Sequence, residues 1–142
     1  MRRIAFLSAL IVLLAASTWR TSAQQPAGRG NPPLFTGTTT VLDGKDLSVA
    51  RRRFEPAART YWHSHDRGQL LLVEDGRMRL QKKGEAMREL ATGQSDYTAP
   101  NVVHWHGATP DRPVVQVNVG FGGDIKWLDP VTDEEYAGKA RR

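Results

Sequence analysis

A chain of 142 residues with 39% hydrophobic and 25% charged residues has the size and composition of one globular domain. Its formal charge of +5 overstates its basicity, because three of the 20 basic residues, Arg2, Arg3 and Arg20, lie near the N-terminus; the remaining 17 face 15 acidic residues, a balance of +2. This balance, without a basic helix or a recognisable binding module, argues against a nucleic-acid partner. The absence of cysteine excludes disulfides and cysteine-linked lipids.

Residues 1–23 have the pattern of a secretory signal peptide. Arg2 and Arg3 precede an uncharged apolar run over residues 4–16, and small residues follow up to Ala23. Because this run is too short to cross a bilayer, we expect cleavage near Ala23, a secreted or periplasmic protein, and no stable membrane anchor after cleavage. An uncleaved anchor is the alternative, and the paired arginines leave export by the Sec or the twin-arginine route open.

Residues 24–33, rich in Gly, Pro and Gln, predict a flexible lead-in. Residues 34–137 then predict one all-β domain, because short strand-like segments alternate with turn signals as in a sandwich or barrel. The predicted strands cover residues 38–42, 47–54, 60–65, 69–74, 77–82, 86–90, 96–98, 102–107 and 114–119. Asp75-Gly76 predicts a tight hairpin. Thr132 and Glu135 form a capping-box pattern that predicts a helical turn over residues 133–137, followed by a frayed tail over 138–142.

All four histidines of the chain fall into two H-x-H pairs, His63 with His65 and His104 with His106. In a strand, residues two apart lie on the same face, so each pair sets two imidazoles side by side. Gln69 follows His65 by four residues and can return to the same site as an oxygen donor. Imidazole with oxygen ligands suits a first-row transition metal, so we predict a metal site. A single histidine would more often be a satisfied core residue.

The two segments around these pairs resemble the two motifs of the cupin family. The first motif, G-x5-H-x-H-x3-E-x6-G, matches from Ala57 to Gly76, and the second, G-x5-P-x-G-x2-H, matches from Gly93 to His104. The resemblance implies an antiparallel double-stranded β-helix, the jelly-roll or cupin barrel, and a metal held by His63, His65, Gln69 and His104. Departures from the motifs are Ala57 and Asn101 at glycine positions, Ala99 at the proline position, and Gln69 at the glutamate position.

Gln69 exchanges an anionic ligand for a neutral one, which leaves more of the metal's charge to polarise a bound substrate or water. With the string from His104 to Pro110, it makes the chain similar to manganese-dependent hydroxynitrile lyases of the cupin family. The resemblance implies one divalent transition metal, manganese first, then iron, nickel or zinc.

Three further residues are candidates for catalysis. Strand alternation groups Arg52 with Ala50 and Phe54, so Arg52 either enters the cavity, where it would bind an anionic substrate, or belongs to a solvated edge strand. His106 shares the face of His104 and is expected near the cavity rim, further from the metal than the ligands, as a proton shuttle, a hydrogen-bonding neighbour or a fourth imidazole ligand. Gln116 stands at a position where the similar lyases look to have a histidine.

We predict an exported mononuclear metalloenzyme of lyase or isomerase type that acts on a small oxygenated organic compound. The alternatives are a cupin dioxygenase and a non-catalytic metal-dependent binding or sensing module, and a sugar-epimerase type of cupin ranks last. A solvent-reachable cavity with an open coordination position would favour an enzyme. Trp62 and Trp105 alternate with the histidines and are expected to pack away from the metal. The expected partners are a small-molecule substrate and a second copy of the chain, in a homodimer or homotetramer.

Overall fold

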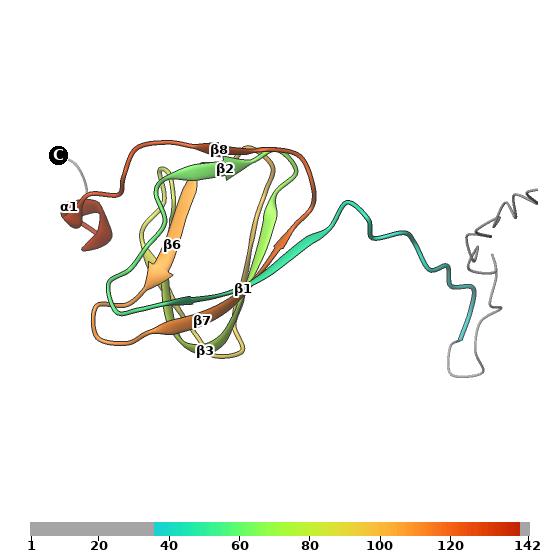
Figure 1. Ribbon diagram of the computed structural model, residues 1–142, viewed down its shortest axis with the longest axis horizontal. Helices are drawn as coiled ribbons and strands as arrows, with labels where there is room; N and C mark the ends of the chain where they lie inside the picture. Colours follow the sequence, from blue (N-terminus) through green and yellow to red (C-terminus); the bar gives the residue numbers. More distant parts are fainter. Residues whose placement is uncertain (1–35, 140–142) are drawn as a thin grey trace, which may run out of the picture. The chain divides into compact units, whose positions relative to one another are not determined.

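The computed structural model describes residues 36–139 (Figure 1). The chain divides into two units, residues 1–42 and residues 43–142. The described part of the first unit contains a bend at Thr36 and Gly37 and no strand, so the strand predicted over residues 38–42 is wrong. Val41 and Leu42 are 98% and 82% exposed, and strand propensity without burial is too weak to form a strand. The predicted signal peptide and lead-in lie outside the described residues.

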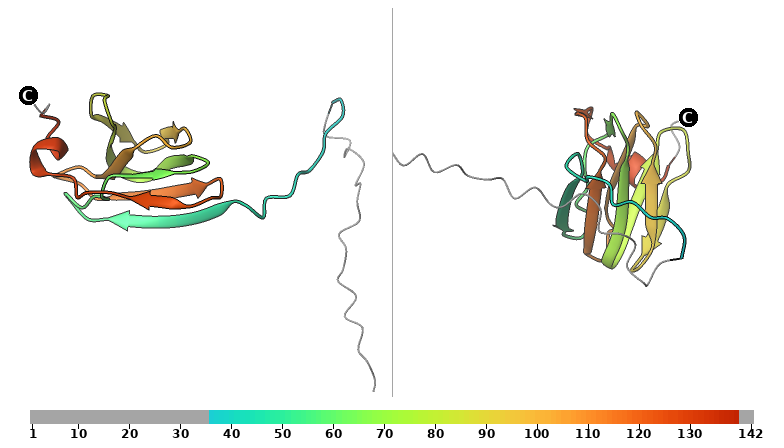
Figure 2. Two further views of the ribbon diagram at one scale, coloured as in Figure 1. Left: turned by 90° about the horizontal axis from the view of Figure 1, so that it is seen from above. Right: turned by 90° about the vertical axis from the view of Figure 1, so that its right-hand side faces the viewer.

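The second unit is an antiparallel barrel of short strands, which confirms the predicted all-β jelly-roll fold (Figures 1 and 2). The hydrogen-bonded strand order is β1-β7-β3-β6-β2-β8, with β4 and β5 paired to β3. The elements are β1 (Ser48–Phe54), β2 (His63–His65), β3 (Gln69–Lys82), β4 (Arg88–Ala91), β5 (Ser95–Thr98), β6 (His104–Ala108), β7 (Val114–Gly120), β8 (Ile125–Trp127) and α1 (Asp133–Tyr136).

Strand β3 runs unbroken through the place where a hairpin was predicted. Its first half pairs with β5 and β7, and its second half pairs with β4 and β6. Between these halves the pairing register with β7 shifts from Val73 to Asp75, and Gly76 has φ 87°. A Cβ on Gly76 would lie 2.1 Å from the Pro113 carbonyl oxygen. Asp75-Gly76 is therefore a bulge that bends one strand from one sheet into the other, and the hairpin prediction is wrong.

Two apolar clusters lie on opposite sides of the sheet formed by β2, β4, β6, β8 and the second half of β3. The first contains Leu71, Val73, Met78, Leu80, Leu90, Ala108 and Val114, with Phe54 packed against it. The second contains Trp105, Val131 and Tyr136, with Trp62 and Met87 packed against it. The second cluster lies beneath the short helix α1, whose capping box joins Thr132 and Glu135 as predicted. Both tryptophans therefore pack away from the histidines, as expected.

Two non-glycine residues adopt left-handed backbone conformations, Ala57 with φ 65° and Asn101 with φ 61°. At these two positions the cupin motifs have glycine and this chain does not, and glycine is the residue that tolerates positive φ without steric cost. Asn101 N donates to the carbonyl oxygen of His65 at 2.8 Å, so this loop is bound directly to strand β2. The loops keep the shape that glycine would give them.

Among the described residues, no helix is long and apolar enough to cross a membrane.

Candidate metal centre

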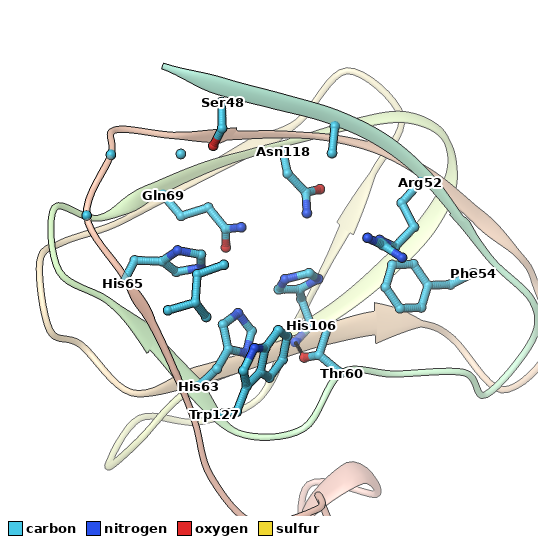
Figure 3. Close-up of a pocket in the computed structure, with 15 residues that line it drawn as sticks. Ser48, Arg52, Phe54, Thr60, His63, His65, Gln69, His106, Asn118 and Trp127 are labelled. Atoms are coloured by element: carbon cyan, nitrogen blue, oxygen red, sulfur yellow. Dashed lines mark hydrogen bonds between the residues drawn. The ribbon is translucent and has the colours of Figure 1, made fainter. Parts of the chain in front are cut away.

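The four histidine side chains gather on one face of the barrel wall, three of them drawn around the cavity in Figure 3. His63 on β2 is paired directly with His104 on β6, and their ring centroids are 4.2 Å apart. The ring of His65 lies 5.2 Å from that of His63, and the ring of His106 lies 5.3 Å from it. The alternation of side chains along two adjacent strands thus brings both H-x-H pairs together, as the sequence predicts.

Backbone hydrogen bonds fix the tautomers of two of these rings. His63 Nδ1 lies 2.9 Å from the Tyr61 carbonyl oxygen, and His104 Nδ1 lies 3.0 Å from the Val102 carbonyl oxygen. A carbonyl oxygen only accepts, so each Nδ1 carries the proton and donates. Burial lowers the pKa of His63 to about 3 and that of His104 to about 4, so both rings are neutral near neutral pH. Each Nε2 therefore presents a lone pair to the cluster.

The Nε2 atom of His104 lies 3.0 Å from Oε1 of Gln69, and both atoms are buried. Since the proton of His104 is already on Nδ1, this contact joins two acceptors when the amide is oriented in this way. Close by, Nε2 of His65 is buried without a hydrogen-bond partner among the described residues. Two donors that bind one ion at about 2.1 Å and at right angles lie about 3 Å apart. The residues present therefore fit a metal ion, which would satisfy these lone pairs together.

His106 differs from the other three histidines in its contacts. Its Nδ1 lies 3.0 Å from Nε2 of Gln116, and the same amide nitrogen donates to Oδ1 of Asn118 at 2.7 Å. With the amide donating, His106 accepts at Nδ1 and carries its proton on Nε2. Burial lowers the pKa of His106 well below its usual value, and the neighbouring His63 and His104 lower it further. His106 is thus a neutral N–H donor, whereas a half-turn of both amides would free its Nε2 as an acceptor.

The ligating atoms of His63, His104 and His106 lie within 4.8 Å of one another, and His65 falls outside this group. The sequence expectation that His106 lies at the cavity rim is wrong, because His106 is only 1% exposed. His106 is buried because it lies on β6, a strand whose five residues are all buried. Because Gln116 donates to Nδ1 of His106, the Nε2 atom of His106 carries a proton and offers no lone pair, unlike Nε2 of His63 and of His104. The predicted ligand set His63, His65, Gln69 and His104 stays a prediction.

A cavity of about 380 Å³ opens onto the histidines. It is lined by His63, His65, Gln69 and His106 at one side and by residues of β1 at the other. Arg52 lines the cavity with Ala50 and Phe54, yet its side chain is exposed and β1 stands at an end of the sheet, so each of the two interpretations left open by the sequence holds in part. Gln116 is fully buried and does not line the cavity; it contacts His106 and Asn118 from behind. The structure therefore brings His106 and Arg52 to the cavity and leaves Gln116 outside it.

Sequence reasoning missed one wall of the cavity. Strand β8 pairs with β2 and contributes Ile125 and Trp127, and the Trp127 ring lies 4.8 Å from the ring of His63. Three residues with a lysine between two apolar side chains give too short an alternation to predict a strand. The one usable signal was the pair of large apolar side chains, left 47% and 57% exposed in the structure, that follow the last predicted strand.

Comparisons with a family model, a curated relative and a solved structure agree with one another. A family model described as the cupin domain matches residues 50–120. An (R)-mandelonitrile lyase from Granulicella tundricola is 35% identical over 121 residues, which cover 79% of this chain and 92% of the relative. The crystal structure of a cupin-like protein from Thermotoga maritima has a TM-score of 0.63 at 37% identity and covers 78% of this chain and 92% of that one.

A more distant likeness concerns the fold alone. A Klebsiella pneumoniae protein with a double-stranded β-helix domain has a TM-score of 0.54 at 22% identity. The similarity covers 63% of this chain and 80% of that chain.

Proposed function

The chain belongs to the cupin family, and from this premise we propose that it is a metal-dependent enzyme of lyase or isomerase type acting on a small hydroxy or carbonyl compound. The observation that carries the proposal is the buried Nε2 of His65, which has no hydrogen-bond partner among the described residues, together with the nearby contact between Nε2 of His104 and Oε1 of Gln69; His65 and Gln69 line the cavity. Buried polar atoms without partners are rare in folded proteins, and they mark places where a ligand completes the site. The similarity to an (R)-mandelonitrile lyase supports hydroxynitrile-lyase-like chemistry.

The proposed ligands are His63, His65, Gln69 and His104. All four are neutral, so a bound divalent ion would keep most of its charge and act as a Lewis acid on a substrate oxygen. Mixed nitrogen and oxygen donors suit manganese first, then iron, nickel or zinc. Neutral imidazoles are the form that binds metals, and burial keeps these histidines neutral at physiological pH by lowering the pKa of His63 and of His104.

The remaining cavity residues would orient the substrate and exclude water. His106 presents an N–H that can donate to a substrate oxygen or nitrile nitrogen, and Gln116 holds its ring in that tautomer. Phe54 packs edge-on against His106, with ring centroids 6.0 Å apart. Trp127 and Ile125 form an apolar wall. A cavity of about 380 Å³ that reaches solvent past exposed side chains suits a small reactant better than a sealed structural or sensing site would.

We also propose export and self-association. Export is supported by the signal-peptide pattern of residues 1–23, with cleavage near Ala23 and release into the periplasm or the medium. Self-association into a homodimer or homotetramer is supported by exposed apolar side chains on one outer sheet face: Val49, Leu72 and Tyr97 are 68%, 39% and 52% exposed. Adjacent exposed apolar residues are typical of protein interfaces.

Metal analysis of the purified protein, followed by an assay of benzaldehyde release from (R)-mandelonitrile, tests the proposal. We expect about one transition-metal ion per chain, as a single mononuclear site requires, and benzaldehyde release that stops on chelation. Wild-type protein without a bound transition metal would refute the metalloenzyme. Bound metal with no cleavage of this or related hydroxy compounds would refute the lyase assignment and favour a dioxygenase or a binding module.

A further inference from the structure

The middle arginine of the run from Arg51 to Arg53 differs from its two neighbours. Arg51 pairs with Glu74 at 2.5 Å, and Arg53 pairs with Glu55 at 2.7 Å. Arg52 lies on the opposite side of the strand and lines the cavity. Within the described part of the chain, its guanidinium has no hydrogen bond or ion pair. The two outward arginines are neutralised by the protein, and the inward one is left available.

The charge of the cavity is one-sided. Neither Asp nor Glu occurs among the residues that line it, and Arg52 is the one charged side chain there. The proposed metal ligands, three histidines and a glutamine, carry no negative charge. The cavity is therefore positive before any cation binds, and more positive afterwards. A concave surface with charge of one sign concentrates ligands of the opposite sign.

The position of Arg52 suits a small two-ended ligand. Figure 3 shows its guanidinium beside the ring of Phe54 and directed into the cavity, on the side where His106 lies. The planar fork of a guanidinium matches a carboxylate, with two parallel N–H donors. Because the guanidinium has no partner of its own, an incoming carboxylate does not have to displace one. The histidines lie at another part of the same cavity wall, where a second oxygen of the ligand can reach them.

We infer that Arg52 is the carboxylate-binding residue of this cavity, and that among small hydroxy and carbonyl compounds the cavity favours those that carry a carboxylate. The carboxylate binds Arg52, and the hydroxyl or carbonyl oxygen faces His63 and His65, which line the cavity. An apolar substituent fits between Phe54 and the wall formed by Trp127. This inference rests on the proposed function for the second oxygen only, since the contact between Arg52 and a carboxylate needs no metal.

Calorimetric titration of the purified, metal-loaded protein with mandelate and with mandelamide tests the inference, because the two probes have nearly the same shape and differ in charge. We expect Arg52→Gln to weaken mandelate binding about thirtyfold, the scale of a lost charge-assisted hydrogen bond. Mandelamide binding should change less than about threefold. Arg53→Gln, the matched control on the outer face, should bind both probes as the wild type does. Arg52→Lys should restore part of the affinity for mandelate, since it keeps the charge and loses the fork.

Three outcomes would overturn the inference: equal mandelate binding by wild type and Arg52→Gln, no mandelate binding by the wild type, or inorganic phosphate that binds more tightly than mandelate and depends equally on Arg52. Repeating the titration after chelation separates this inference from the proposed function. A wild type that holds no metal refutes the metalloenzyme, while the ratio between wild type and Arg52→Gln still measures the arginine contact. Metal retained in both proteins with a ratio near one refutes the arginine contact alone.

Discussion

Two buried polar clusters lie in this barrel, and they differ in whether their atoms have partners. In the carboxylate cluster, Asp96 is 6% exposed, accepts from Lys82 at 3.2 Å and from Thr98 at 3.0 Å, and is also paired with Arg88. In the histidine cluster, Nε2 of His65 has no partner, and Nε2 of His104 faces another acceptor. The first cluster is complete within the chain and serves stability. The second is incomplete within the chain and serves a ligand.

The largest expected effect comes from removing a ligand of the histidine cluster while keeping its volume. His104→Leu should lower the affinity for a divalent metal by more than about a hundredfold. The loss of a residue that only hydrogen-bonds to a ligand costs about ten- to a hundredfold. Without metal, the free energy of unfolding of this variant should fall by less than about 1.5 kcal/mol, because the substitution also removes the unfavourable contact between two lone pairs, on His104 and Gln69. Metal titration and thermal melting measure the two quantities.

The same measurement on His65→Leu and His106→Leu distinguishes the two possible ligand sets. If His63, His65, Gln69 and His104 hold the metal, His65→Leu loses it, and His106→Leu retains it to within about tenfold, as expected for a neighbouring residue. The reverse pattern would replace His65 by His106 in the ligand set.

The carboxylate cluster should respond in the opposite way. Asp96→Asn leaves Lys82 without its buried counter-charge, so the free energy of unfolding should fall by about 2 to 3 kcal/mol. Metal affinity should stay within about threefold of the wild type, because the variant changes no proposed ligand. Urea unfolding of metal-free protein measures the stability. Asp43→Asn, which removes an exposed pair with Lys45, is the control and should cost less than about 1 kcal/mol. Equal losses in both variants would contradict the structural role of Asp96.

The two clusters should also lose their contributions at different pH. Burial lowers the pKa of His63 from 6.5 to about 3 and that of His104 to about 4, so the unfolded chain binds more protons than the folded chain between about pH 6.5 and these values. These two groups alone should therefore cost metal-free protein about 2 kcal/mol of stability between about pH 7 and about pH 5.5, and His65 and His106, whose pKa values are also lowered, add to that loss. Chemical denaturation at several pH values measures this.

Asp96 should contribute nothing to that loss. Burial alone would raise its pKa, but the hydrogen bonds from Lys82 and Thr98 outweigh burial and hold the pKa below its usual value of 3.8. Its contribution is complete above pH 3.8 and is lost only as the pH falls through the lowered value. In His63→Leu protein, the loss of stability between pH 7 and pH 5.5 should shrink by about 1 kcal/mol, since one titrating histidine is gone while His104, His65 and His106, whose pKa values are also lowered, remain. An unchanged loss would assign the titration to other groups.

The smallest effect is expected from a change within the histidine cluster that adds charge. Gln69→Glu supplies an anionic ligand, so it should tighten metal binding by about tenfold and lower the effective charge of the metal. Turnover should change more than metal retention does. Equal metal affinity and equal turnover in the two proteins would show that the neutral amide has no special role.

The predictions from sequence succeeded where a local pattern alone decides the outcome. Alternation along strands predicted that both H-x-H pairs share one face, and the capping box at Thr132 predicted α1. Alternation also grouped Arg52 with Ala50 and Phe54, which line the cavity with it, but left open whether Arg52 is solvated. The predictions failed where a distant contact decides. Asp75-Gly76 is a common hairpin sequence, yet here the close approach of Pro113 makes it a bend inside one strand. The tautomer of His106 depends on Gln116, ten residues away on another strand, so no spacing rule could predict it.

The order of the sheet has one consequence for how molecules reach the cavity. Strands β1 and β8 stand at its two ends, both line the cavity, and no pairing of the described residues joins them. Side chains from Ser48 to Phe54 and from Ile125 to Trp127 can therefore move apart without breaking any bond between strands. Transient widening at this junction needs no local unfolding, so amide hydrogen exchange in β2 and β6 can stay slow while small molecules come and go. The barrel can therefore be rigid at β2 and β6, which hold the histidines, and flexible between β1 and β8, where a small molecule enters the cavity.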